Sequence, residues 1–432
     1  MNNKTIQEKV QPIINKITTN RYLKSVSDGI ASILPAIIVG AIFTLLANLP
    51  ISSYQEFLTS SGLGQVLKLP ITFTTDLIAL YSVFFIGYKL AESFEGNGAI
   101  AGLLSLVSFF VVTPLVVAEK VKFISFEWLG AKGLFVAIIV GLVASRLYVA
   151  IIKKGIIIKM PNGVPPTISS SFTALVPAFI VIPFFSVVAM IFSKTDFASV
   201  HGFVYKFVQT PLEGLGGTLT SLIIVMIVAH VLWLFGIHGM MVSMSIMMPI
   251  WTSLNIQNLE AYNSGEPLPN IICSAFIMVY VLVGGSGGTL GLNLYMSFKG
   301  KSKRYKTLGN LSLPGSICSI NEPLIFGTPV IMNPKLAIPF VATPVVCTII
   351  AYYATYFGFV PRLMGAALPL GTPIGVSGFL QGGFSVVALQ MILVVVSFII
   401  YLPFARSLDK EAYEQEQKES DDEVDFSDID FD

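Results

Sequence analysis

Charged residues are scarce in this 432-residue chain: 12% are Asp, Glu, Lys or Arg, whereas 54% are hydrophobic. A soluble domain carries about 25% charged residues, and the mean hydropathy here is +0.78. The composition therefore excludes an ordinary soluble domain and predicts a protein that crosses a membrane several times. The net charge is only +1, and no concentration of basic residues predicts nucleic-acid binding.

Cysteine is also rare, with three residues in the whole chain. Cys273, Cys318 and Cys347 lie in apolar segments and lack the spacing of a disulfide framework or a metal site. They are expected to be small core residues. We expect no metal and no cofactor.

Acidic side chains are nearly missing from one long stretch: Glu322 is the only one between Pro267 and Leu408. A carboxylate at membrane depth costs roughly 3 kcal/mol unless it faces a partner or a wet cavity. Two prolines and a glycine follow it within seven residues, which prevents a continuous spanning helix. Glu322 is therefore the first functional candidate. The alternative is a residue in a turn at the membrane surface.

Long apolar segments predict an all-α polytopic membrane protein with ten transmembrane helices. The predicted spans are 26–49, 73–94, 98–117, 133–152, 172–192, 216–235, 240–254, 271–298, 336–357 and 385–404. Lys and Arg cluster after the fourth and eighth spans, which predicts that these loops and both termini are cytoplasmic.

Two further apolar segments, near 313–334 and 368–384, are interrupted by proline and glycine. Each predicts a re-entrant hairpin, because irregular backbone at membrane depth is tolerated only where it lines a cavity or is buried in protein. Two hairpins that meet would resemble the broken-helix substrate sites of transporters. Counting both as full spans would give twelve spans, and charge alone does not decide between the two counts.

A third interruption, from Gly284 to Gly288, falls inside the eighth predicted span. Glycine lets backbone approach a ligand or lets a helix unwind. It equally permits close packing of helices through small residues. Both interpretations stay open from the sequence.

His238 stands between two glycines at the break between the sixth and seventh spans. An imidazole there can donate or accept a proton near neutral pH. With Glu322 it could hold a hydroxyl group, provided that both lie within about 3 Å of it. By contrast, His230 is expected to pack between helices, and His201 is assigned no chemistry.

The sequence predicts five regions along the chain, two of which are membrane domains. Residues 1–25 are expected to form a cytoplasmic, interfacial amphipathic N-terminus, 26–192 an N-terminal membrane domain, 193–215 an amphipathic connector, 216–405 a second membrane domain, and 406–432 an acidic, disordered cytoplasmic tail. The tail is interpreted as solubilising, with docking of a basic partner as the alternative.

One long motif carries a family resemblance. The run from Asn321 to Pro329, continuing to Ile338-Pro339-Phe340, resembles the signature of the membrane (IIC) component of bacterial phosphoenolpyruvate-dependent sugar phosphotransferase systems, in the lactose/cellobiose/diacetylchitobiose family. The runs Asn20 to Lys24 and Gly236 to Gly239 are similar to the same family. The resemblance covers about residues 8–405.

The resemblance implies a homodimer in the bacterial cell membrane with an elevator mechanism. The N-terminal domain would form the dimer contact, and the second domain would bind the sugar. Glu322 and His238 would hold the sugar hydroxyl that accepts the phosphoryl group. A phosphocysteine on a IIB protein would donate it, so IIB and IIA components are implied partners. The residues that would line the sugar site with them are Asn321, Gly284, Gly285, Ser286 and Gly287.

Two departures from the family pattern bear on specificity and anchoring. Leu370 stands where cellobiose-like members carry a tryptophan, and it offers less area for stacking on a sugar ring. Ser27 replaces an arginine that many relatives have. A β-disaccharide such as cellobiose, lactose or chitobiose is still expected, with Leu370 counted among the contacts.

Only 26 residues follow Arg406, so we expect no IIB domain in this chain and no complete transferase activity from it alone. Two other classes stay open. A cation-coupled sugar or solute symporter would use Glu322 as its coupling site. A sensor or scaffold would show no solute flux.

Overall fold

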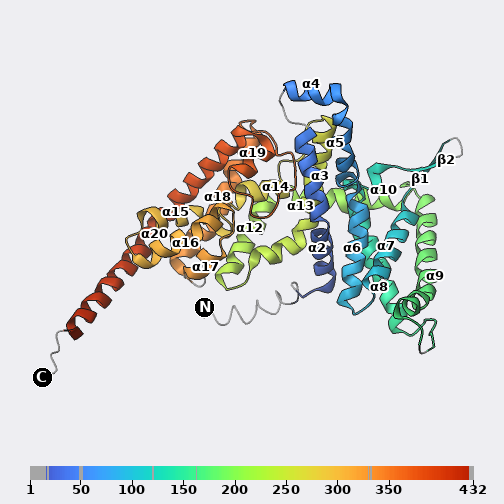
Figure 1. Ribbon diagram of the computed structural model, residues 1–432, viewed down its shortest axis with the longest axis horizontal. Coiled ribbons are helices and arrows are strands. Elements are labelled where there is room, and N and C mark those ends of the chain that lie inside the picture. The colour runs from blue at the N-terminus through green and yellow to red at the C-terminus, as the bar shows by residue number, and fades with distance from the viewer. Residues whose placement is uncertain are drawn as a thin grey trace. The chain divides into compact units, whose positions relative to one another are not determined.

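The computed structural model describes residues 16, 19–47, 52–118, 121–161, 163–328, 330 and 333–427. The described residues are mostly helical and divide into two compact units (Figure 1). The first unit comprises Met1–Gly217, Met244–Cys273 and Gly365–Ala367, and the second comprises Thr218–Ser243, Ser274–Met364 and Leu368–Asp432. Most of the expected amphipathic N-terminus, residues 1–15, 17 and 18, lies outside the described residues.

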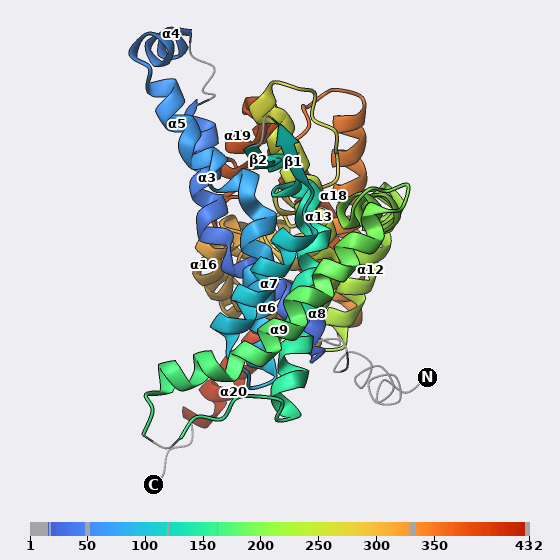
Figure 2. The same cartoon turned by 90° about the vertical axis from the view of Figure 1, so that its right-hand side faces the viewer.

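The first unit is built from α-helices joined by short helical turns. Its α-helices are α2 (Arg21–Ser32), α3 (Leu34–Ala47), α4 (Ser52–Ser61), α5 (Leu63–Thr72), α6 (Ile78–Ser93), α7 (Gly98–Val112), α8 (Leu134–Lys153), α9 (Pro166–Ser193), α10 (Val200–Val204), α11 (Thr210–Gly216) and most of α13 (Gly239–Ser264). The turns are η1 (Thr75–Leu77), η2 (Phe126–Trp128), η3 (Ala131–Gly133) and η4 (Tyr205–Gln209). Figure 2 shows α4 and α5 at one end of this unit, beyond α3.

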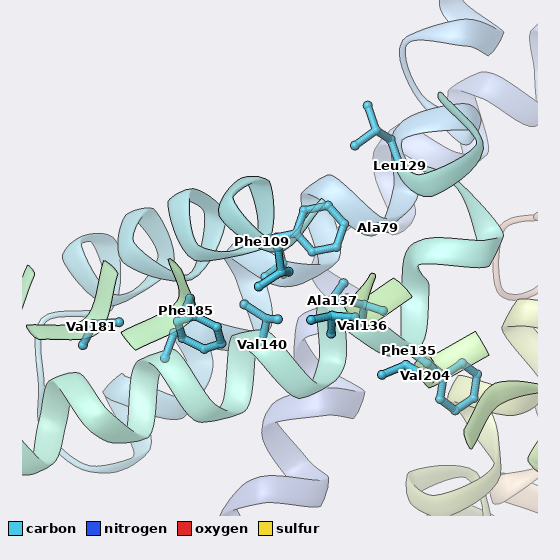
Figure 3. Close-up of a cluster of buried hydrophobic side chains, with 14 of the residues drawn as sticks. Ala79, Phe109, Leu129, Phe135, Val136, Ala137, Val140, Val181, Phe185 and Val204 are labelled. Carbon is cyan, nitrogen blue, oxygen red and sulfur yellow. The ribbon is translucent and has the colours of Figure 1, made fainter. Parts of the chain in front are cut away.

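Small residues let α6, α7 and α8 pack closely. The Ser145 hydroxyl donates to the Gly87 carbonyl at 2.8 Å, and a Cβ at Gly87 would lie 2.2 Å from the Ser105 hydroxyl oxygen. Helices that lack bulky side chains at the contact can approach in this way. Figure 3 shows the adjoining apolar core, in which Phe109 and Phe185 are buried.

Strands β1 (Leu115–Ala118) and β2 (Val121–Ile124) pair as an antiparallel hairpin after α7. The expectation of an all-α chain is therefore wrong here, and the predicted span 98–117 is too long, because α7 ends at Val112. Pro114 cannot continue the helix, and β-branched valines favour extended backbone.

The boundary between the two units differs from the predicted domain boundary. The chain leaves the first unit after Gly217, close to the predicted 216, but most of α13 belongs to the first unit. Two hydrogen bonds explain this. The Trp251 indole N–H donates to the Gly216 carbonyl at 3.2 Å, and the Asn255 amide donates to the Gly365 carbonyl at 2.6 Å.

The predicted connector, 193–215, forms α10, η4 and α11. It was expected to be amphipathic, but several of its polar residues, among them Gln209 and Glu213, are buried in the protein. The Gln209 amide donates to the Glu213 carboxylate at 2.8 Å, and the Ser253 hydroxyl donates to the same carboxylate at 2.6 Å. His201 is also buried, and its ring packs 5.3 Å from the Phe109 ring. The connector is therefore fixed to α13 through a buried polar network.

The second unit contains the two sequence segments that were predicted to be hairpins. Its elements are α12 (Leu219–Leu234), the start of α13, α14 (Ser274–Phe276), η5 (Ile277–Val281), η6 (Ser286–Gly288), α15 (Leu290–Lys299), α16 (Lys303–Ile317), α17 (Glu322–Gly327), α18 (Pro334–Tyr356), α19 (Val376–Gly382) and α20 (Phe384–Ser427).

Five described helical segments are long and apolar enough to cross a membrane, and up to eight if each of three bent pairs forms one span. The five are Leu63–Ser93, Ala131–Lys153, Ile168–Ser193, Lys335–Tyr356 and Phe384–Lys418. The bent pairs are α2 with α3, Val200–Gly216 with α12, and Ser274–Gly288 with α15. A multi-span helical protein is thereby supported, while the count of ten stays a prediction.

The acidic tail is helical in its described part, because α20 continues without a break to Ser427. The prediction of disorder from residue 406 is wrong for these residues. No proline or glycine follows Pro403, and Leu408 and Ala412 are buried in an apolar cluster with Tyr305. Helix formers and tertiary packing together outweigh the negative charge.

Two carboxylates of this helix hold the segment that leads into α16. Asp409, which is buried, accepts hydrogen bonds from the backbone N–H groups of Lys301 and Ser302 at 2.9–3.0 Å. Glu416 accepts from the N–H groups of Lys303 and Arg304 at 2.9 and 3.0 Å. We call these contacts the carboxylate clamp. It fixes the start of α16 to α20.

Asp409→Asn is expected to loosen the carboxylate clamp, because an amide group would set a donor against the N–H groups that Asp409 now accepts. A hydrogen bond to a charged group contributes about 2 kcal/mol, so local opening should make amide hydrogen exchange in residues 301–306 roughly 30-fold faster. Glu414→Gln is the control, since that carboxylate pairs only with exposed Lys410, at 3.7 Å, among the described ion pairs. Equal exchange in both variants would contradict the clamp.

Candidate functional site

Glu322 lies at the tip of a helical hairpin formed by α16 and α17. The two arms run antiparallel, because Gly327 packs against Leu308 and Gly315 packs against the Ile320 carbonyl. Ser319 at the turn has φ +58°, and Pro323 follows in the first turn of α17, where a missing N–H costs nothing. The predicted interruption at Asn321-Glu322-Pro323 is confirmed.

The Glu322 side chain is exposed. Within the described part of the chain, no hydrogen bond occupies its carboxylate oxygens. It also stands in the first turn of α17, where the N-terminal end of a helix favours negative charge. The carboxylate is therefore free to accept a hydrogen bond from a ligand.

His238 lies in the short break between α12 and α13, and its side chain is half-buried. Its Nδ1 accepts a hydrogen bond from the Met241 N–H at 3.3 Å, so in the neutral ring the proton is on Nε2. Gly239 is required beside it, because a Cβ there would lie 1.8 Å from the Ala229 carbonyl oxygen. The break thus presents Nε2–H as a hydrogen-bond donor.

Glu322 and His238 belong to the same unit, and the helices that carry or adjoin them meet through aromatic rings. The rings of Trp233 and Phe326 link their two elements: Trp233 lies 4.3 Å from the His238 ring and 6.3 Å from the Phe326 ring. The structure therefore places the break that holds His238 beside the helix that begins at Glu322, while their action on one shared hydroxyl stays a prediction. Together they provide one acceptor and one donor.

Asn321 is buried and connects the hairpin tip to the glycine-rich stretch. Its amide donates to the Ser286 carbonyl at 2.7 Å and to the Thr289 hydroxyl at 2.6 Å. Gly285 lies directly beneath it, since a Cβ there would be 2.4 Å from the Asn321 side chain. Both N–H donors of Asn321 are thus used within the protein, which leaves only its oxygen for a ligand.

The glycine-rich stretch from Gly284 to Gly288 is closely packed, and its backbone carbonyl groups are hydrogen-bonded within the unit. Gly284, Gly285, Gly287 and Gly288 all have positive φ, which favours glycine. Every carbonyl from 284 to 288 accepts a hydrogen bond from within the unit; the donors are Thr289, Gly288, Asn321, Tyr401 and Ser397 in order along the stretch. Close packing accounts for the glycines, while sugar contacts through Gly284, Gly285, Gly287 and the half-buried Ser286 stay a prediction.

The second hairpin segment reaches the first hairpin. The Ile374 N–H donates to the Ile317 carbonyl at 2.9 Å, and Gly371 lies against the Ile320 side chain. Leu370 is 83% exposed beside this contact. The two segments are thus in contact, while their entry into the membrane as re-entrant hairpins and a role for Leu370 in sugar contact stay predictions.

Gln390 of α20 holds the second hairpin and was missed in the sequence. Its buried amide donates to the Val279 carbonyl at 3.0 Å and to the Ser377 hydroxyl at 3.1 Å, and its oxygen accepts from the Gly375 N–H at 3.0 Å. An amide inside an otherwise apolar predicted span was the signal that could have identified it. Trp233, five residues before His238, was missed as well.

The described residues contain no group of three or more His, Cys, Asp or Glu side chains that could hold a metal ion. The remaining chemistry is a carboxylate and an imidazole at two helix breaks, next to a second interrupted segment. This arrangement, within a chain of long apolar helices, is typical of a polytopic membrane protein of the transporter class, in which broken helices build the substrate site.

Comparison with known proteins identifies the family. The family model "Phosphotransferase system, EIIC" matches residues 27–344. The lichenan permease IIC component of Bacillus subtilis (strain 168) is 38% identical over 96% of this chain and 95% of its own. The cellobiose-specific EIIC component of Geobacillus stearothermophilus is 36% identical over 95% of each chain. The crystal structure of ChbC, the IIC component from the N,N'-diacetylchitobiose-specific phosphotransferase system, has a TM-score of 0.90 at 38% identity, over 96% of this chain and 99% of that one.

The chain belongs to the EIIC family of the sugar phosphotransferase system. The resemblance deduced from the Asn321–Pro329 motif is thereby confirmed. The protein is a sugar permease component in a bacterial membrane, and the cation-coupled symporter is not favoured.

Proposed function

We propose that this permease binds a β-linked disaccharide or a related oligosaccharide, such as cellobiose, lactose or chitobiose, and presents one of its hydroxyl groups for phosphorylation. The observation that carries the proposal is that the exposed Glu322 carboxylate and the half-buried His238 imidazole stand at two helix breaks whose elements meet through the rings of Trp233 and Phe326. The relatives named for lichenan and cellobiose support a β-linked glucose-type sugar.

The two side chains have distinct roles in this proposal. Glu322 accepts the hydrogen of the sugar hydroxyl, which raises the nucleophilicity of an alcohol that is hardly ionised at neutral pH. The hydroxyl oxygen then bonds to phosphorus while the phosphorus–sulfur bond of a IIB phosphocysteine breaks, and Glu322 takes the proton. His238 donates through Nε2 to a sugar oxygen and fixes the approach.

The proposal extends to the roles of the two units, the membrane topology and the partner proteins. The second unit carries the sugar, with Leu370, Ser286 and the Asn321 oxygen near it, and the first unit forms the contact of a homodimer. The protein has ten transmembrane helices, two re-entrant hairpins and cytoplasmic termini, and the second unit moves as an elevator. IIB and IIA components supply the phosphoryl group.

A sugar-binding screen of the purified protein in detergent tests this function. At least one β-linked disaccharide should raise the melting temperature, and the same sugar should be phosphorylated when phosphoenolpyruvate and the IIA and IIB components are supplied. Accumulation of unmodified solute driven by an ion gradient, with no sugar phosphate formed, would contradict the proposal.

His238→Ala is expected to weaken sugar binding about tenfold, because loss of one hydrogen bond costs about 1.5 kcal/mol. Retention of radiolabelled sugar by the detergent-solubilised protein measures the change. The melting temperature without sugar serves as the control, and it should change little because His238 is only half-buried. An unchanged affinity would remove His238 from the site.

A further inference from the structure

Trp233 contacts both elements that carry the proposed site residues. It lies at the end of α12 and is 3% exposed. Its ring is tilted by 46° against the His238 ring at 4.3 Å, and it meets the Phe326 ring edge-on at 6.3 Å. Phe326 follows Glu322 by four residues in α17, so the two share one face of that helix.

The indole of Trp233 contributes ring contacts and makes no hydrogen bond within the described residues. Its Nε1 is buried without a partner, although a buried tryptophan N–H usually has one. Trp251 shows the ordinary case, since it is fully buried and donates to the Gly216 carbonyl. Burial also prevents Trp233 from stacking on a sugar. Its ring contacts are with His238 and Phe326, and it joins them to the apolar cluster that contains Leu324.

We infer that Trp233 is a positioning residue that sets the orientation of the His238 imidazole relative to Glu322. The Met241 N–H fixes Nδ1 of the ring, and the indole face fixes the ring plane. Together they hold the imidazole in one orientation next to the element that contacts α17. The inference rests on the proposed function, in which His238 and Glu322 hold one sugar hydroxyl.

The contact itself can be measured without sugar. In a Trp128→Phe/Trp251→Phe background, Trp233 is the only tryptophan of the chain. A protonated imidazole in contact with an indole quenches its fluorescence, so emission should fall as the pH is lowered and His238 gains a proton. The decrease should disappear when His238→Gln is added. Emission that is independent of residue 238 would overturn the inference.

A second measurement tests the consequence for the reaction. Trp233→Leu should lower the rate of sugar phosphorylation about tenfold or more and change the KM less, because misorientation of a reacting group lowers kcat. Trp233→Phe keeps an aromatic face and should stay within about threefold of the unsubstituted protein. Trp251→Phe is the matched control for loss of a buried indole, and melting temperatures identify any variant that fails to fold.

The two measurements separate the inference from the function on which it rests. If quenching depends on His238 but the unsubstituted protein binds no sugar, the contact stands and the proposed function fails. If sugar is phosphorylated normally by Trp233→Leu, the proposed function stands and the positioning role is excluded.

Discussion

Glu322→Gln is expected to lower sugar phosphorylation at least about 100-fold, which is the usual contribution of a positioned general base. Glutamine keeps the size and an acceptor oxygen but cannot take the proton of the sugar hydroxyl. The amount of folded protein in the membrane should not change, because the carboxylate is exposed and makes no hydrogen bond among the described residues. Sugar phosphate formed with IIA, IIB and phosphoenolpyruvate is the measurement.

Glu266→Gln is the matched control, since it removes an exposed carboxylate from the first unit. It should leave both sugar binding and phosphorylation unchanged. Normal sugar phosphate production by Glu322→Gln would remove Glu322 from the reaction, whatever its position at the hairpin tip.

Gly287→Ala is expected to destabilise the second unit by about 2–4 kcal/mol. Gly287 has φ +77°, where an L-residue costs about 1 kcal/mol, and a Cβ would lie 2.2 Å from the Phe340 ring. That ring cannot move easily, because it is 1% exposed and packs 5.3 Å from the His230 ring. Overpacking of this kind adds about 1–3 kcal/mol. The melting temperature should fall by roughly 5 °C or more.

Gly358→Ala separates backbone strain from steric overlap. Gly358 also has a positive φ, +80°, but a Cβ there would have no atom within 4 Å. This variant should lose only about 1 kcal/mol. Equal losses in both variants would show that conformation alone, and not the contact with Phe340, explains the glycine at 287.

An isolated carboxylate and a glycine-flanked histidine are conspicuous in an apolar chain, so the sequence alone selects Glu322 and His238 as candidates, and their role in the reaction stays a prediction. Glu322 and His238 were separated by 84 positions, and no spacing rule could place them in one site. That required α12 and α17 to be neighbours, which depends on packing through Trp233 and Phe326.

Contacts between residues that are distant in the sequence could not be predicted from local sequence patterns. Glycine serves close packing and ligand approach equally well, so only the donors on each carbonyl show how the stretch from Gly284 to Gly288 is used. The tail was predicted to be disordered from its charge, but Asp409 and Glu416 accept backbone N–H groups that are distant in sequence. Likewise, nothing near α13 indicates that Asn255 pairs with Gly365.

The uninterrupted helix α20 has a mechanical consequence. It begins at Phe384, directly after the second hairpin, and ends at Ser427 (Figure 1). At 1.5 Å per residue its 44 residues span about 66 Å. Near its beginning, the Gln390 side chain accepts a hydrogen bond from the Gly375 N–H. Farther along, Asp409 and Glu416 accept hydrogen bonds from backbone N–H groups at the start of α16. One helix therefore joins both interrupted segments, so a displacement at Gly375 would be transmitted through α20 to the start of α16.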